Sequence, residues 1–259
     1  MKKTPVVPEL SMFPEQFRPL LAGCQVFDSS CSEMARVWFL DREGGLYLKR
    51  SPKGTLSREA AMTRFFCGKG LGAQVLAYES LEEDWLLTTA VVGEDCTADR
   101  YTSDPKRLSA LLGERLRLLH EMPFAGCPVP DHTARYLARV EENYRKGVFD
   151  PRSVGSSFDT PEAAFAAVKE GRCLLKSDTL LHGDYCLPNI MLKDWSFSGF
   201  IDLDQSGVGD RHVDLFWGVW TLQFNLHTDI WGGRFLDAYG RDAVDESLLR
   251  VISAAEVFG

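Results

Sequence analysis

The stretch LLHGDYCLPNIML (residues 180–192) and the following SGFIDLDQSG (residues 198–207) place oxygen-bearing side chains between aliphatic runs. The apolar runs NIMLK and FSGFIDL predict two short strands joined by the turn DWS. We expect Asp184 and Asn189 in the loop that leads into this hairpin, and Asp202 near the end of its second strand. The hairpin would then bring the three side chains to one end.

Two carboxylates and an amide carbonyl are hard oxygen ligands, which suit magnesium held jointly with substrate phosphates better than zinc. Phosphoryl transfer needs such a metal, a lysine on the phosphates and an aspartate oriented toward the attacking hydroxyl. Lys49 on an upstream strand can be that lysine, and Glu59 on the next helix can hold it by an ion pair. Asp202 stands between Ile201 and Leu203, where an unpartnered carboxylate in an apolar strand would be costly to bury. That cost favours a functional role.

The upstream part of the chain predicts short strands broken by turn residues. The strand segments are VWFL (37–40), LYLK (46–49), QVLAYE (74–79) and DWLLTTA (84–90), and TLSREAAMTRFFCGKG (55–70) between them has helical spacing. We therefore expect a small antiparallel-sheet lobe over residues 1–91.

After VVGED (91–95) the pattern becomes helical. SDPKRLSALLGERLRLLHEMP (103–123) opens with capping-type residues and Pro105 and continues with leucines at helical spacing. Residues 148–160, rich in Gly, Ser, Pro and Asp, predict a loop between helices. The fold class is therefore α+β, with a larger, mainly helical lobe over residues 92–259.

Composition narrows the function classes. The chain has 259 residues, 45% of them hydrophobic, enough for a substantial core. Its formal charge is −8, and all of the excess lies after residue 91, where 18 basic residues face 26 acidic ones. That bias disfavours nucleic-acid binding, which needs clustered cations. It suits either attraction of a cationic substrate or a surface kept soluble by acidic residues.

The sequence has no apolar run of signal-peptide or membrane-span length, so we expect a cytoplasmic protein without a membrane partner. Its seven scattered cysteines form no C-x-x-C pair, which suits a reducing compartment and argues against structural zinc.

From residue 26 to residue 259 the sequence resembles the aminoglycoside phosphotransferases, most closely their 3'-phosphotransferase branch, and LLHGDYCLPNIMLKDWSFSGFIDLDQSGVGDRHVDL carries the densest likeness. The resemblance implies a two-lobed protein-kinase-like fold and transfer of the γ-phosphate of ATP or GTP to an aminoglycoside hydroxyl, giving antibiotic resistance. It implies that Asp184 orients the substrate hydroxyl and can deprotonate it, and that His182 and Asp214 brace this loop.

For the nucleotide, the resemblance implies Asn189 and Asp202 as Mg²⁺ ligands. The other residues that it places at the nucleotide are the phosphate lysine Lys49, its partner Glu59, Ser30 and Ser32 of the phosphate loop, and Thr89 and Val91 of the hinge.

For the cationic aminosugar, the family uses acidic groups of the large lobe and the terminal carboxylate. Glu256 and the carboxylate of Gly259 match this pattern, and Asp159 either adds a replacement acid or caps a helix. Trp220 replaces a usual arginine and Phe224 a usual glutamate.

Further departures are Val257 in place of a second acid, Gly259 in place of an aromatic residue, Asp204 in place of a glycine and Gln205 in place of a basic residue. These changes leave open a kinase of the same fold that acts on another small alcohol, with Trp220 and Phe224 lining a less polar pocket. A catalytically dead nucleotide-binding regulator is disfavoured, because the candidate phosphoryl-transfer residues are all present.

Overall fold

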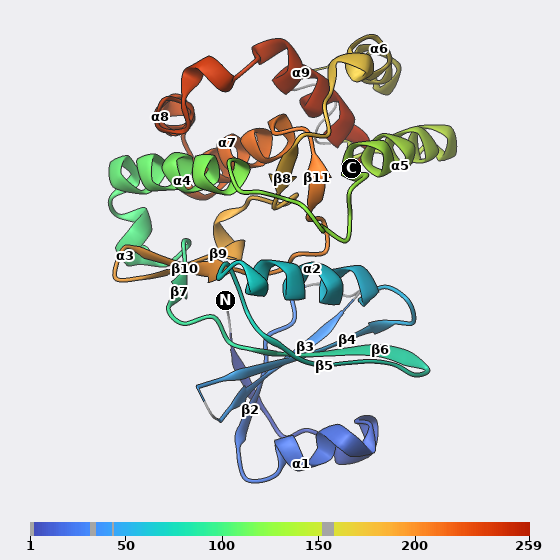
Figure 1. Ribbon diagram of the computed structural model, residues 1–259, viewed down its shortest axis with the longest axis vertical. Coiled ribbons are helices and arrows are strands. Elements are labelled where there is room, and N and C mark those ends of the chain that lie inside the picture. Colours follow the sequence, from blue (N-terminus) through green and yellow to red (C-terminus); the bar gives the residue numbers. More distant parts are fainter. Residues whose placement is uncertain (1–2, 32–34, 43, 152–157) are drawn as a thin grey trace. The chain divides into compact units, whose positions relative to one another are not determined.

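The computed structural model describes residues 3–31, 35–42, 44–151 and 158–259. Its contacts divide the chain into two compact units, residues 1–95 with 188–204 (the sheet unit) and residues 96–187 with 205–259 (the helical unit). The segment 188–204 therefore packs with the sheet unit although it follows much of the helical unit in sequence. Both units are drawn in Figure 1.

The sheet unit contains a six-stranded antiparallel sheet in the order β1-β2-β3-β4-β6-β5. The strands are β1 (Thr4–Val6), β2 (Gln25–Asp28), β3 (Arg36–Asp41), β4 (Leu46–Pro52), β5 (Val75–Ser80) and β6 (Glu83–Thr89). The four strands predicted between residues 37 and 90 are thus confirmed, and β1 and β2 extend the sheet at one edge.

Helix α2 (Ser57–Gly68) covers one face of this sheet, and the short α1 (Arg18–Leu21) lies on the opposite face (Figure 1). The buried carboxylate of Asp84 accepts a hydrogen bond from the backbone N–H of Leu56 at 2.9 Å, directly before α2 begins. Ala60 and Leu56 pack on Leu86 of β6. This packing determines which face of α2 meets β4 and β6. It therefore also determines the position of Glu59 in the first turn of α2.

The predicted hairpin is present as β9 (Ile190–Lys193) and β10 (Ser196–Phe200), joined to β7 (Glu94–Asp95). Asp194 and Trp195 form its turn with φ values of 51° and 65°, the left-handed backbone that two-residue hairpin turns require.

The prediction that Asp202 stands within the second, apolar strand, near its end, is wrong. Strand β10 ends at Phe200, and Asp202 has a left-handed φ of 58°, which cannot continue a strand. The side chain of Asp202 is 52% exposed, so its charge is not buried and the expected burial cost does not apply.

The helical unit contains α3 (Asp99–Thr102), α4 (Pro105–His120), α5 (His132–Lys146), α6 (Pro161–Gly171), α7 (His212–Leu226), α8 (Ile230–Tyr239) and α9 (Glu246–Ala255). Strands β8 (Thr179–Leu181) and β11 (Gly207–Gly209) pair antiparallel within it. Across both units, the described residues form short 3₁₀ turns at Leu10–Met12, Glu15–Phe17, Arg172–Leu174, Leu187–Asn189, Arg241–Ala243 and Glu256–Phe258.

The predicted start of the helix at Pro105 is confirmed in detail. Pro105 occupies the first turn of α4, and the side chain of Asp104 accepts from the backbone N–H of Arg107. Helix α6 is capped by Thr160, whose hydroxyl accepts from the Ala163 N–H at 3.1 Å. The described parts of the predicted loop, 148–151 and 158–160, lie between α5 and α6.

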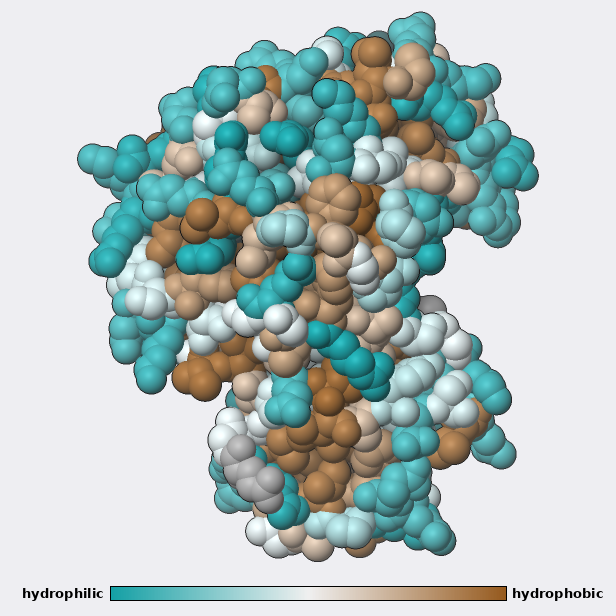
Figure 2. Space-filling view, viewed as in Figure 1, coloured by the Kyte–Doolittle hydropathy of each residue, from teal (hydrophilic) through white to brown (hydrophobic). Residues whose placement is uncertain are grey.

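The observed antiparallel sheet and helical unit confirm the α+β class. Among the described residues, no helix is long and apolar enough to cross a membrane. In the view of Figure 2, hydrophilic side chains cover most of the visible surface of the helical unit, with smaller apolar areas between them.

Candidate active site

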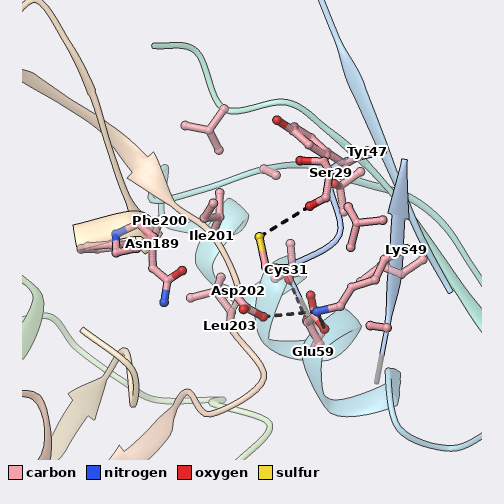
Figure 3. A pocket seen from close by; sticks show the side chains of 18 of the residues that line it. Ser29, Cys31, Tyr47, Lys49, Glu59, Asn189, Phe200, Ile201, Asp202 and Leu203 are labelled. Atoms are coloured by element: carbon pink, nitrogen blue, oxygen red, sulfur yellow. Dashed lines mark hydrogen bonds and ion pairs between the residues drawn. The ribbon is translucent and has the colours of Figure 1, made fainter. Parts of the chain in front are cut away.

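A pocket of about 300 Å³ opens in the sheet unit. Side chains from the sheet, from α2 and from the β9–β10 hairpin line it (Figure 3). The lining residues are Ser29, Cys31, Ala35, Val37, Tyr47, Lys49, Glu59, Thr63, Ala73, Leu86, Thr88, Thr89, Val91, Pro188, Asn189, Phe200, Ile201, Asp202 and Leu203.

Lys49 is the charged centre of this pocket. Its Nζ donates to Glu59 Oε2 at 2.7 Å and to Asp202 Oδ1 at 3.2 Å (Figure 3). Burial alone would lower the pKa of Lys49, but the carboxylates of Glu59 and Asp202 outweigh it and raise the pKa above its usual value. Lys49 is therefore a fixed positive charge at neutral pH. The ion pair expected between Lys49 and Glu59 is confirmed.

The strand register explains which neighbours share the pocket face with Lys49. Tyr47 and Lys49 are two residues apart on β4, so their side chains point to the same face. Their partners across the ladder, Thr88 and Leu86, point to that face as well. Tyr47, Thr88 and Leu86 were missed in the sequence, although the period-2 alternation around Lys49 was a signal for Tyr47.

Asn189 and Asp202 both line the pocket, and the backbone connects them. Asn189 ends the 3₁₀ turn before β9, and its carbonyl accepts from the Ile201 N–H at 3.0 Å. This hydrogen bond joins Asn189 to the residue directly before Asp202. One amide oxygen and one carboxylate suit a hard divalent cation whose remaining ligands are phosphate oxygens and water.

Within the described part of the chain, no three His, Cys, Asp or Glu side chains form a group that could hold a metal by themselves.

Only some of the residues that were predicted to surround the nucleotide line the pocket. Thr89 and Val91 line the pocket, whereas Ser30 is not among the lining residues and Ser29 and Cys31 are. The hydroxyl of Ser30 accepts from the Val37 N–H at 3.0 Å, which closes the loop between β2 and β3. Ser32 lies outside the described residues.

The loop that carries Asp184 belongs to the helical unit and is held by Asp214. The buried Asp214 carboxylate accepts from the backbone N–H groups of His182 and Gly183, each at 2.7 Å, and lies 3.1 Å from Nε2 of His120. Burial alone would raise the pKa of Asp214, but these hydrogen bonds and charges lower it below its usual value. Gly183 has a φ of 85°, which favours glycine. These contacts confirm that Asp214 holds this loop, and His182 Nδ1 accepts from the Asp184 N–H at 3.3 Å.

Glu256 lies in the helical unit beside Tyr136 of α5, whose hydroxyl donates to Glu256 Oε1 at 2.7 Å. Burial raises the pKa of Glu256 to about 7, and the charge of Asp184 adds to the rise, against the lowering effects of Tyr136 and Arg139. Asp184 and Glu256 are therefore electrostatically coupled. Gly259 is exposed, and its N–H donates to the Glu256 carbonyl at 3.4 Å.

Trp220 and Phe224 project from α7 with 39% and 61% of their surface exposed. Their rings stack at 4.9 Å with an interplanar angle of 11°. Asp159 is exposed before α6, and the cap of that helix is its neighbour Thr160, so the alternative that Asp159 caps the helix is wrong.

Lys49, Glu59, Thr89, Val91, Asn189 and Asp202 thus share one pocket of the sheet unit, whereas Asp184, Glu256, Trp220 and Phe224 belong to the helical unit.

Comparison with solved structures defines the class of fold. The chain aligns with aminoglycoside-3'-phosphotransferase of type VIII at a TM-score of 0.72 and 24% identity, covering 96% of each chain. It aligns with aminoglycoside phosphotransferase APH(3'')-Id from Streptomyces rimosus at a TM-score of 0.73 and 21% identity, covering 94% of this chain and 97% of that one. The kinase-like phosphotransferase fold is therefore confirmed.

Sequence comparison defines the family. Residues 28–251 match the phosphotransferase enzyme family. The chain is 47% identical over 252 residues to a "Probable aminoglycoside 3'-phosphotransferase" of Lactococcus lactis, covering 96% of both chains. It is 30% identical over 168 residues to an aminoglycoside 3'-phosphotransferase of Niallia circulans, covering 64% of both. The chain belongs to the phosphotransferase enzyme family.

Proposed function

We propose that this phosphotransferase moves the γ-phosphate of ATP or GTP to a hydroxyl of an aminoglycoside antibiotic and so gives resistance. The observation that carries the choice of substrate is the 47% identity, over 96% of both chains, to a protein named as a probable aminoglycoside 3'-phosphotransferase. The pocket built around Lys49 supports the phosphoryl chemistry.

In this proposal the nucleotide occupies the pocket of the sheet unit. Lys49, held by Glu59, meets the phosphates, because a lysine fixed by a carboxylate is the usual phosphate contact of kinases. Backbone groups of Thr89 and Val91 meet the base. Ser30 and Ser32 belong to the phosphate loop.

Asn189 and Asp202 would hold Mg²⁺ together with nucleotide phosphates, where the ion neutralises negative charge during transfer. An amide oxygen and a half-exposed carboxylate on one pocket wall fit this ion.

Asp184 orients the acceptor hydroxyl and takes its proton as the hydroxyl oxygen forms a bond to the γ-phosphorus. The bond between that phosphorus and the bridging oxygen of the nucleotide breaks, and the diphosphate leaves. Asp184 can do this because Asp214 fixes the loop through His182 and Gly183. Catalysis then comes mainly from positioning and charge stabilisation.

The aminosugar is bound by acidic groups of the helical unit. Glu256 and Gly259 are the principal candidates, and Asp159 adds a negative charge. The acidic excess after residue 91 favours a small cationic partner over nucleic acid or a membrane surface. We place the protein in the cytoplasm, where nucleoside triphosphates are available.

One observation favours a second candidate, a kinase of the same fold for a less polar alcohol. The stacked, exposed rings of Trp220 and Phe224 offer an apolar surface where the family pattern has charged side chains. Such a surface favours an acceptor with fewer amino groups.

A coupled nucleotide-turnover assay separates the two candidates. The purified protein is given ATP or GTP with Mg²⁺ and, in separate reactions, a panel of aminoglycosides and a panel of uncharged small alcohols of similar size. Stimulation by aminoglycosides supports the proposal. Stimulation only by an uncharged alcohol would replace it with the second candidate.

A further inference from the structure

An ion pair beside the pocket joins α2 to the segment that follows β10. Arg58 Nε lies 3.1 Å from Asp204 Oδ1, and Arg58 Nη2 lies 2.5 Å from Asp204 Oδ2. This two-point contact is the geometry in which a guanidinium holds a carboxylate most specifically. Both side chains are only 28% exposed.

The two residues are the neighbours of the charged centre. Arg58 directly precedes Glu59, and Asp204 follows Asp202 by two residues. Lys49 links Glu59 to Asp202, so two ion-pair connections run side by side between α2 and the segment 202–204.

The segment itself has little regular structure to hold it. Asp202 has a left-handed φ of 58°, and residues 201–203 belong to no strand or helix. Leu203 is 1% exposed and anchors the segment, with one aspartate on each side of it. The two carboxylates of this segment are each held by a cation, Asp202 by Lys49 and Asp204 by Arg58.

We propose that Arg58 is a positioning residue that holds Asp204, so that Asp202 is the carboxylate of this segment that meets Lys49 and the nucleotide-bound cation. The inference rests on the proposed nucleotide site. Without Arg58, Asp204 competes with Asp202 for Lys49 and adds negative charge where the phosphates must bind. An ordinary surface ion pair would contribute little to binding or stability. The geometry differs from that case in its two-point contact, its partial burial and its place beside Glu59.

The test measures binding of MgATP by calorimetry, and slow hydrolysis of ATP by water, without any acceptor alcohol. Arg58→Met keeps the aliphatic stem of the side chain but removes its charge. We expect it to weaken MgATP binding by about tenfold. The double variant Arg58→Met with Asp204→Asn should restore binding close to the wild-type value, because the competing charge is gone. Arg64→Met, an exposed arginine on the same helix, is the matched control.

If the Arg58–Asp204 ion pair only stabilised the fold, the double variant, which also lacks the ion pair, would bind MgATP no better than Arg58→Met. Restored MgATP binding in the double variant therefore distinguishes the positioning role from a structural one. Wild-type binding by Arg58→Met, or weak binding that Asp204→Asn does not restore, would overturn the inference. Urea unfolding of each variant separates loss of binding from loss of fold. Wild-type protein that binds no MgATP would instead remove the proposed nucleotide site, and this inference with it.

Discussion

Replacing Glu256 by Gln should stabilise the protein at pH 8 and have a much smaller effect on its stability at pH 5. The pKa of Glu256 is raised from 4.5 to about 7 in the folded chain, chiefly by burial. Between these two values the folded state keeps a proton that the unfolded state releases. The free energy of unfolding of the wild type therefore falls as the pH rises through this window, and the loss is complete above about pH 7.

The magnitude follows from the shift. The rise in the pKa of Glu256 from 4.5 to about 7, at about 1.4 kcal/mol per pH unit, corresponds to a penalty of at most about 3.5 kcal/mol above pH 7. The side chain is only partly buried, so solvent screening reduces this figure, and we expect 1 to 3 kcal/mol, roughly. Glutamine cannot ionise, yet its amide oxygen can still accept from the hydroxyl of Tyr136.

The assay is urea unfolding followed by tryptophan fluorescence at several pH values between 5 and 8. Glu170→Gln, an exposed carboxyl on α6, serves as the control, and its effect should not change with pH. If the difference in unfolding free energy between Glu256→Gln and wild type were the same at pH 5 and pH 8, the raised pKa would be wrong.

The same titration has a consequence for the proposed substrate. A polycation gains attraction only from the ionised form of Glu256, and a charge-assisted contact contributes about 1.5 to 3 kcal/mol. The ratio of kcat/KM for an aminoglycoside between wild type and Glu256→Gln should therefore rise with pH and reach about tenfold above pH 7. An unchanged ratio would show that Glu256 does not contact the substrate.

Three further substitutions test the remaining roles. Asp184→Asn should lower turnover by a factor on the order of 100 or more while nucleotide binding persists, and turnover within a few-fold of wild type would contradict its role. Asp202→Ala should abolish the magnesium dependence of nucleotide binding in a calorimetric titration, while Lys49 keeps its partner Glu59. Asp214→Asn should destabilise the fold by about 3 kcal/mol in urea, because it alters a buried carboxylate that accepts two backbone hydrogen bonds. Because the pKa of Asp214 is lowered, its stabilisation should be present at neutral pH and fade as the pH falls below its usual value near 3.8.

Most of the secondary structure was readable because its causes are local. Strands β3 to β6 alternate or cluster apolar residues within a few positions, and α4 carries its own cap and first-turn proline. Strands β1 and β2, of 3 and 4 residues, were not predicted, because strands this short are stabilised by pairing along the sheet rather than by their own sequence.

The end of β10, at the candidate site, is likewise set by contacts with distant parts of the chain that the local sequence does not reveal. FSGFIDL reads as one apolar run, yet the Phe200 N–H bonds to Leu71 and the Ile201 N–H to Asn189, after which the chain turns at Asp202. Those hydrogen-bond partners come from distant parts of the chain. Asp202 lines the pocket, but its exposed side chain contradicts the burial that the apolar run suggested.

The kinds of chemical group at the candidate site could be read from the sequence: a lysine on a strand, a glutamate on the next helix, and Asp184, Asn189 and Asp202 of HGDYCLPN and FIDLD. Residue types and short spacings are properties of the chain alone. The contact of Arg58 with Asp204 across 146 positions, and the burial that raises the pKa of Glu256 to about 7, follow from the folded arrangement. Ion pairing and desolvation depend on which groups folding brings within a few ångströms of each other, and no local pattern encodes that distance.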